Sequence, residues 1–335
     1  MKTSRFLLFF VLLASILGPL ACTPLSVSPP TSQPDSAKES KPKKTYEDLI
    51  VGFAQLGAES EWRVANTDSI KETAEELGVE LRFYDAQQKQ DNQILAVRKL
   101  IFEKVDIIGI APIVETGWDE VFQEAKDAGI PIIFVDRRAD VPGDLYISYL
   151  GSNFLEEGRN AARVMAGLVD GRAKIVELVG TIGSAPANDR YTGFREVLTK
   201  YPAMQIIDSK SGDFTRARGK EVMADFLNKH GSLITAVFAH NDDMALGAIE
   251  AIEEYGLRPG VDIKIVSVDA AKGAFEAMIA GKLNATVECN PLLGPQFFEL
   301  ALKVVNGEPV PKWVPSIETT FFPEDAAEIL PTRKY

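Results

Sequence analysis

The sequence predicts an α/β protein whose parallel sheets are divided between two lobes. From Leu49 onward, short apolar runs alternate with amphipathic stretches at a spacing of about 25 residues, as in strands joined by crossover helices. About ten such strands are expected, which is too many for one small domain. The chain of 335 residues is long enough for two domains. We therefore expect two Rossmann-like lobes with helices on both faces of each sheet.

The predicted elements follow the period of the apolar residues. Strands are expected where an apolar run is short and continuous, as in strands buried on both faces: 49–54, 79–84, 105–111, 131–135, 145–150, 174–179, 204–208, 235–239, 262–268 and 284–289. Helices are expected where apolar residues recur at helical spacing: 67–77, 94–102, 119–128, 155–169, 190–200, 216–229, 244–252 and 273–280. Gly78 and Gly129 each follow such a stretch, which is a helix C-cap signal.

The beginning of the chain has the pattern of an export signal. Lys2 and Arg5 precede an apolar run over 6–17, which has signal-peptide length and is too short for a comfortable membrane span. We expect residues 1–21 to be removed as a signal peptide. This segment is either an ordinary secretory signal, cut near Ala21, or the signal of a lipoprotein, for which the next residue is the evidence.

A lone cysteine follows this run and is the candidate lipidation site. Ala21-Cys22 resembles the lipobox of bacterial lipoproteins, although Pro19 stands where that pattern prefers an aliphatic residue. Residues 22–45 are rich in Pro, Ser and Lys and predict a disordered tether behind the lipid on Cys22. The folded part would then lie outside the cytoplasmic membrane, in the periplasm or on the outer face. No segment after the tether is apolar for long enough to span a bilayer.

Charge and composition exclude several classes of protein. The formal net charge is −12 with a pI near 4.9, which argues against a nucleic-acid partner, because phosphate binding needs a basic face. With Cys22 in the targeting region, Cys289 has no partner for a disulfide framework, and we expect it to be an unreactive core residue.

Signatures of common enzymes and metal sites are missing from the sequence. There is no Walker A loop and no Gly-x-Ser-x-Gly elbow, and the segment 180–185 lacks the spacing of a dinucleotide-binding loop. His230 and His240, with two cysteines in the whole chain, argue against a zinc site. We therefore expect no catalytic residues, no cofactor and no metal.

Polar residues follow several predicted strands directly. Asp85, Asp136 and Asp269 each end a strand that begins after a glycine, and His-Asn-Asp-Asp at 240–243 follows the strand 235–239. The carboxyl ends of parallel strands meet at one edge of a sheet, where open α/β folds bind ligands. A single such aspartate is better explained as a helix cap or turn residue. The set together favours a polar cleft.

The loop after the first strand has the residue types that bind sugars. Glu59, Trp62 and Arg63 combine an aromatic face, which packs against sugar C–H groups, with charged groups that hydrogen bond to hydroxyls. The alternative is that Trp62 fills the base of the next helix. Acid–base neighbours recur at two other strand–helix junctions, where exposed ion pairs are the simpler explanation: Asp136-Arg137 and Asp189-Arg190.

Five segments make the chain similar to a known family. The sequence Phe-Ala-His-Asn-Asp-Asp-Met-Ala-Leu-Gly-Ala at 238–248, with the leader and the two lobes, resembles the extracytoplasmic sugar-binding proteins of ABC transporters, the ribose-binding or type I periplasmic binding protein group. Segments 51–63, 87–90, 111–118 and 210–216 look most like the members that bind galactofuranose. The resemblance extends over roughly 49–330 and its segments occur in the family's order.

The resemblance implies an architecture and a mode of binding. Two lobes would be joined by a three-strand hinge, with crossings near 150–153, 288–291 and 316–321. The N-terminal lobe would comprise 46–151 plus 290–316, and the C-terminal lobe 152–289 plus 317–335. A sugar would lie between the lobes and be trapped by closure about the hinge.

The resemblance also implies the binding residues, carried over motif by motif: Glu59, Ser60, Trp62, Arg63, Asp136, Arg137, Arg190, Phe214, Asn241, Asp269 and Glu288. Glu288 lies at the second crossing and would contact either the ligand or the hinge. Within 240–243 we expect Asn241 to contact the ligand, Asp242 and Asp243 to open and cap the following helix, and His240 to support the loop. Glu61 and Ala58 depart from the galactofuranose pattern, which has Gly and Ser there, and this leaves the identity of the sugar open.

The function implied is that of a non-catalytic, monomeric lipoprotein that captures a galactofuranose-like monosaccharide and delivers it to an ABC permease. A transcription repressor shares this core but would need a helix-turn-helix before Leu49, where the leader and tether stand. A secreted sugar enzyme would use paired carboxylates such as Asp136 and Asp269. A binder of another small polyol or a signalling furanone is the remaining alternative.

Overall fold

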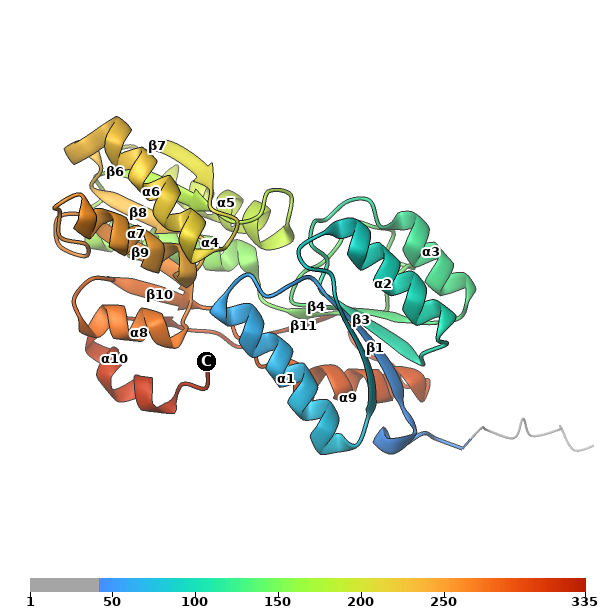
Figure 1. The fold of residues 1–335 in the computed structure, drawn as a ribbon. Helices are drawn as coiled ribbons and strands as arrows, with labels where there is room; N and C mark the ends of the chain where they lie inside the picture. The colour runs from blue at the N-terminus through green and yellow to red at the C-terminus, as the bar shows by residue number, and fades with distance from the viewer. Residues whose placement is uncertain (1–41) are drawn as a thin grey trace, which may run out of the picture. The chain divides into compact units, whose positions relative to one another are not determined.

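The computed structural model describes residues 42–335, which form two six-stranded sheets, so the predicted two-lobed α/β fold is confirmed (Figure 1). The first sheet has the order β11-β5-β4-β3-β1-β2 and the second β12-β10-β9-β8-β6-β7. The strands of the first sheet are β1 Ile50–Gln55, β2 Glu80–Asp85, β3 Ile107–Ile110, β4 Ile132–Val135, β5 Ser148–Gly151 and β11 Trp313–Pro315. Those of the second are β6 Ala173–Val179, β7 Met204–Ser211, β8 Ala236–Ala239, β9 Lys264–Asp269, β10 Ala285–Glu288 and β12 Thr320–Phe321. All neighbours pair in parallel except β10 and β12, which are antiparallel.

The predicted leader 1–21, Cys22 and the tether as far as residue 41 lie outside the described residues. Among residues 42–335, no helix combines the length and the apolar character needed to cross a membrane.

The chain passes between the two sheets three times. It leaves β5 at Gly151 and enters the second sheet's layer at Phe154, the first residue of α4. It returns after Glu288, the last residue of β10, to the helix that begins at Gly294. It passes again between β11 and β12. Each sheet is therefore built from segments that are distant in sequence.

Helices cover both faces of the first sheet. These are α1 Glu61–Leu77, α2 Gln90–Phe102, α3 Asp119–Asp127 and α9 Gly294–Val305. On one face α1 and α9 lie side by side (Figure 1). There Ile70 of α1 and Phe297 of α9 belong to the same core as Phe53 of β1. On the other face, Val97 of α2 and Phe122 of α3 share a second core. The packing of α9 is close, because a Cβ at Gly109 of β3 would lie 2.5 Å from the Phe297 ring.

The second sheet is covered in the same way, by α4 Phe154–Leu168, α5 Ala185–Leu198, α6 Arg216–His230, α7 Asp242–Glu254, α8 Lys272–Ile279 and α10 Pro323–Ile329. Phe154 and Phe194, from α4 and α5, form the core of one face. Val222, Met244 and Phe275, from α6, α7 and α8, belong to the core of the other. Three short 3-10 turns complete the described residues, at Tyr46–Asp48, Gly231–Leu233 and Leu330–Thr332.

Apolar periodicity placed the strands better than the helix starts. The end of α1 is as predicted, with Gly78 at φ 71° in the left-handed region that glycine tolerates. Its start is six residues earlier than the predicted 67, because its first turns carry the buried polar residues Arg63 and Asn66, which interrupt the apolar pattern. Helix α5 likewise begins at Ala185 rather than at 190. No element was predicted for α9, although Pro295 at its start is a helix signal.

Candidate ligand-binding site between the two sheets

A polar cavity lies where the carboxyl ends of strands from both sheets meet. The side chains of the two sides lie close together, so the cavity is small, about 20 Å³, little more than the volume that holds one water molecule. From the first sheet's layer, its lining comes from the segment after β1 and the end of β4: Glu59, Ser60, Trp62, Arg63, Asp136 and Arg137. From the second sheet's layer it comes from α5 and the ends of β7, β8, β9 and β10: Pro186, Arg190, Phe214, Asn241, Asp269 and Cys289.

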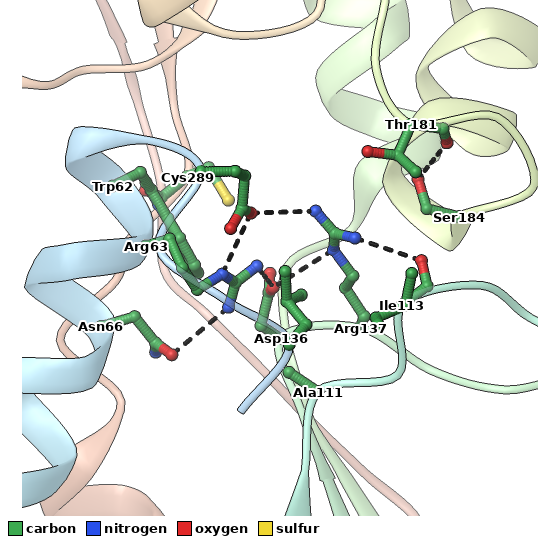
Figure 2. A network of polar contacts seen from close by, with 12 residues as sticks. Trp62, Arg63, Asn66, Ala111, Ile113, Asp136, Arg137, Thr181, Ser184 and Cys289 are labelled. Carbon is green, nitrogen blue, oxygen red and sulfur yellow. Dashed lines mark hydrogen bonds and ion pairs between the residues drawn. The ribbon is translucent and has the colours of Figure 1, made fainter. Parts of the chain in front are cut away.

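Charged side chains from α1 and β4 form one buried network on the first side. Arg63 Nη2 donates to Asp136 Oδ2 at 2.5 Å, and Arg63 Nε donates to Glu59 Oε1 at 3.3 Å. Arg137 Nη2 donates to the same Glu59 oxygen at 3.3 Å, and its Nη1 donates to the Ile113 carbonyl. Figure 2 shows Arg63 between Asp136 and Asn66, with Arg137 facing the same space. The network fixes both guanidinium groups before any ligand arrives.

Burial affects the two arginines differently. It lowers the pKa of Arg63, but the Asp136 and Glu59 carboxylates raise it by more, so the net shift is upward. Burial and the neighbouring Arg63 cation together lower the pKa of Arg137 to about 10. Both groups remain cations at neutral pH. The positive charge of Arg137 is less fully compensated by neighbouring carboxylates than that of Arg63. A ligand that adds a hydrogen-bond acceptor therefore stabilises Arg137 more than Arg63.

Arg190 is the centre of a second network, on the other side of the cavity. Its Nε donates to Glu157 Oε2 of α4 at 2.7 Å, its Nη1 donates to the His240 carbonyl at 2.6 Å, and its Nη2 lies 3.8 Å from Asp269. Burial opposes the charge of Arg190, but these carboxylates raise its pKa above the ordinary value. Burial also raises the pKa of Asp269 well above its usual range, although the Arg190 cation lowers it.

Two buried polar atoms of the first network have no hydrogen-bond partner in the described part of the chain. They are Glu59 Oε2, an acceptor, and Arg137 Nε, a donor. A buried polar atom without a partner costs about 1–3 kcal/mol, so a ligand that supplies a donor to one and an acceptor to the other gains that free energy back. A hydroxyl group can do either.

Aromatic faces border the cavity from both sides. Phe214 of the β7–α6 segment lies under two cations, with the guanidinium carbons of Arg137 and Arg190 at 5.2 and 6.0 Å from its ring centre. The ring occupies the space beside Gly180, where a Cβ would meet it at 1.9 Å. Trp62 packs with core residues of the second sheet's layer, and its Nε1 donates to the Cys289 carbonyl at 2.5 Å. Trp62 therefore bridges the two sides.

Three lining residues at strand ends have backbones in the left-handed region. These are Asp136 at φ 66°, Phe214 at φ 61° and Asp269 at φ 129°. Such conformations cost of order 1–3 kcal/mol each for residues other than glycine and are concentrated at functional sites. Here they turn each side chain out of its strand direction toward the cavity.

The structure brings together all of the predicted binding residues except Glu288. The carboxylate of Glu288 accepts hydrogen bonds from Arg333 at 2.8 Å and from Tyr335 at 3.1 Å, away from the cavity lining. Cys289, the next residue, lines the cavity instead, and so does Pro186, and neither was predicted. Successive side chains along a strand point to opposite sides, so if Glu288 points away from the cavity, Cys289 was the residue to expect in its lining.

The helix after β8 begins differently from the prediction. Asn241, and not an aspartate, is the N-cap of α7, since its Oδ1 accepts from Met244 N at 3.0 Å, while its Nδ2 donates to the Phe214 carbonyl. Asp242 accepts from Ser267, Thr286 and Ala271 N, and so joins α7 to β9 and β10. His240 is buried and accepts from Gly180 N at 3.4 Å, which is the supporting role expected for it.

The two acid–base neighbours predicted from sequence are not the principal pairs. Asp136 bonds Arg63, and Arg137 Nε is 3.9 Å from it. Asp189 bonds Arg138 of the first sheet's layer at 2.7 Å, whereas its neighbour Arg190 bonds Glu157. Asp85, the third strand-end aspartate, is exposed and accepts from the Gln87 backbone N–H, which is the turn role that we gave as the simpler explanation.

One cluster of possible metal ligands occurs beside the cavity, where single ligand atoms of Glu157, Cys289 and Glu318 lie within 4.8 Å of one another. Glu157 is already paired with Arg190. Burial raises the pKa of the Cys289 thiol well above its ordinary value, so it is a protonated thiol at neutral pH. Burial likewise raises the pKa of Glu318 to about 8.

Two parallel sheets with a charged, aromatic-bordered cavity between their strand ends define a ligand-binding protein of the two-lobed α/β class. A model of the periplasmic binding protein domain matches residues 51–309, and the chain belongs to that family. It is 44% identical over 291 residues to the galactofuranose-binding protein YtfQ of Escherichia coli (strain K12), covering 85% of this chain and 92% of that protein.

Solved structures agree with this assignment. A protein from Mycobacterium smegmatis in complex with β-D-fucofuranose is 51% identical, with a TM-score of 0.84 over 86% of this chain and 95% of that one. The periplasmic binding protein of the arabinose ABC transporter from Shewanella sp. ANA-3, bound to α- and β-L-arabinofuranose, is 45% identical, with a TM-score of 0.83 over 85% and 95%.

Proposed function

We propose that this protein is an extracytoplasmic solute-binding protein that captures a monosaccharide in its furanose form and delivers it to an ABC permease. The observation that carries the proposal is the cavity, with a buried acceptor on Glu59 and a buried donor on Arg137 that have no partner among the described residues. Three relatives named above are described as binding galactofuranose, fucofuranose or arabinofuranose. The family is one of binding proteins, and we assign this chain no enzymatic activity.

The charges of the cavity favour a neutral ligand. Three guanidinium groups line it, from Arg63, Arg137 and Arg190, and three carboxylates line it as well. Because these charges compensate one another, the ligand need not supply any. Charged groups that are already paired still form strong hydrogen bonds to hydroxyls. A small polyol such as a monosaccharide fits this chemistry.

We assign residues 46–151 plus 290–316 to an N-terminal lobe and residues 152–289 plus 317–335 to a C-terminal lobe. The assignment is supported by the three passages of the chain between the two sheets. The ligand would enter while the lobes are apart, and closure about the three connecting segments would bury it. Glu59, Ser60, Trp62, Arg63, Asp136 and Arg137 would then bind from one lobe, and Arg190, Phe214, Asn241 and Asp269 from the other.

Calorimetry with the purified protein tests the binding function. We expect D-galactose, D-fucose or L-arabinose to bind with a dissociation constant in the micromolar range or below, about −8 kcal/mol. The methyl pyranoside of the same sugar is the matched control, because its ring is locked and cannot become a furanose, so it should release little heat. Absence of heat and of a thermal shift with every sugar would overturn the proposal.

We also propose that Cys22 carries a lipid that anchors the protein to the membrane, so that the protein works as a tethered monomer beside its permease. The support is the sequence Ala21-Cys22 behind an apolar leader. Metabolic labelling with a fatty-acid analogue should mark the wild type, and Cys22→Ala should release the protein from the membrane fraction. An unlabelled wild-type protein, secreted in soluble form, would instead support the ordinary secretory signal.

A further inference from the structure

A hydrogen bond joins the two sides of the cleft next to the cavity. Asp243 of α7 accepts from the backbone N–H of Glu61 at 3.0 Å, although the two residues are 182 positions apart in sequence. Glu61 is the first residue of α1, and its N–H is one of those that an α-helix cannot satisfy within itself. Ser60 caps Arg63 N in the same turn at 3.1 Å. The start of α1 is therefore capped from both sides, once by its own chain and once by the opposite sheet's layer.

This turn of α1 carries binding residues. Glu59 directly precedes it, and Trp62 and Arg63 lie within it, all three lining the cavity. Trp62 also reaches the opposite side through its bond to the Cys289 carbonyl. The Asp243 bond is made only when the two layers are together, since its donor and acceptor belong to different layers. It thus forms together with the site that it supports.

We propose that Asp243 is a positioning residue that holds the first turn of α1 in the closed site, an inference that rests on the proposed sugar-binding function. Its contact with Glu61, made on closure, would couple sugar capture to the uptake of a proton.

The charges around Asp243 explain the proton. Three carboxylates lie near that of Asp243: Glu61 on the opposing helix α1, Asp242 on α7 itself, and Asp269 at the end of β9. Arg216 of α6 is the cation that compensates them. Lys334 borders the groove that Asp243 lines, and so do the carboxylates of Glu59, Asp68 and Glu72. Burial raises the pKa of Asp243 to about 7, the Glu61 and Asp242 charges add to the rise, and the Glu61 N–H and Arg216 oppose it. The side chain is only 8% exposed.

The sign of the coupling follows from the two states. Separation of the layers removes Glu61 and admits water, so the pKa of Asp243 returns toward that of an ordinary aspartate, about 3.9. The closed state then holds a proton between about pH 4 and pH 7 that the open state lacks. Sugar affinity should therefore be highest in acid, fall as the pH rises from about 4 to 7, and level off above pH 7. A single group with these pKa values changes affinity about tenfold between pH 6 and pH 8.

Three variants separate this role from a merely structural one, each measured by calorimetry from pH 5 to pH 8.5. Asp243→Asn keeps an acceptor for the Glu61 N–H but cannot titrate, so it should retain binding and lose the roughly tenfold change in affinity between pH 6 and pH 8. Asp243→Ala removes the acceptor and should weaken binding about fivefold at pH 8 through faster release. Glu61→Gln keeps the backbone donor and removes the repulsion, so the closed-state pKa of Asp243 should fall and the affinity should level off at a lower pH than in the wild type. Glu76→Gln, an exposed acid near the end of α1 that does not line this groove, is the matched control and should follow the wild type.

The outcomes are distinct. If the wild type binds sugar and Asp243→Asn shows the same pH profile, the coupling is wrong, and if Asp243→Ala binds like the wild type, the positioning role is wrong. If the wild type binds no sugar at any pH, the proposed function fails and this inference fails with it. The inference is supported if Asp243→Asn binds sugar with an affinity that changes little with pH and Asp243→Ala binds sugar more weakly than the wild type.

Discussion

Replacement of Arg190 by alanine tests the electrostatic structure of the cavity. The guanidinium group lies between Glu157 at 2.7 Å and Asp269 at 3.8 Å, and it also holds the His240 carbonyl. All three charged side chains are almost completely buried. Removing one partner of a buried ion pair costs about 3–5 kcal/mol, because the remaining charge has neither water nor a counter-ion. In a protein of this size that corresponds to a fall in melting temperature of roughly 10 °C.

The loss of stability in Arg190→Ala should depend on pH. Burial already raises the pKa of Glu157 and Asp269, and loss of the Arg190 cation raises both further. Groups whose pKa is higher in the folded state stabilise it most below their unfolded pKa, and the stabilisation is lost as the pH rises through the folded value. The variant should therefore be less impaired at pH 5 than at pH 8.

Scanning calorimetry without sugar at both pH values measures this. Arg172→Ala is the control, because that arginine is exposed and its loss should change stability by no more than about 0.5 kcal/mol. The reasoning would be refuted if Arg190→Ala melted within two or so degrees of the wild type at pH 8, or if it were more impaired at pH 5.

Three further predictions concern single positions. Glu59→Gln should weaken sugar binding by about 1.5–3 kcal/mol, because the free Oε2 of the carboxylate is then lost as a charged acceptor, and an unchanged dissociation constant would contradict this. Gly180→Ala should lower both melting temperature and affinity, since its Cβ would lie 1.9 Å from the Phe214 ring. Gly167→Ala, on an open helix face, should be neutral or stabilising by up to about 1 kcal/mol, and equal losses in both variants would contradict the packing argument. Burial raises the pKa of the Cys289 thiol, so iodoacetamide at pH 8 should modify it only after the protein unfolds. Mass spectrometry would locate the modified residue, and rapid labelling of the folded protein would contradict the prediction.

The strands were predictable because both faces of each sheet are covered. Strands such as β3 and β8 are buried along their whole length and are therefore continuous apolar runs. Helix starts were less predictable where the first turn serves the cavity. In α1 the residues Trp62, Arg63 and Asn66 face the other layer or the charged network, so the apolar period appears only from Ile70 onward.

The binding residues could be located from sequence, but their partners could not. Strand ends and motif resemblance led to Arg63, Asp136 and Arg190, which line the cavity. Neighbouring residues suggested the pair Asp136-Arg137, whereas the left-handed turn at Asp136 directs its carboxylate to Arg63 of another element. The partner of Arg190 is Glu157, a residue of α4 that no local sequence pattern indicates. Such pairs depend on how helices pack across a sheet, which local patterns do not contain.

The balance of charge in the cavity also predicts which ligands it rejects. Arg63 is bound by Asp136 and Arg190 by Glu157, so neither of these guanidinium groups is free for an anionic ligand. A sugar acid or sugar phosphate would add a buried negative charge beside the carboxylates of Glu59 and Asp269 without gaining a free cation, apart from the single unpaired Nε of Arg137. Burial of an uncompensated charge costs several kcal/mol. We therefore expect galacturonate to bind at least a hundredfold more weakly than the neutral sugar of the same configuration. Equal affinity for the acid in calorimetry would show that the arginines are available to an anion, and that the ion pairs open when the ligand binds.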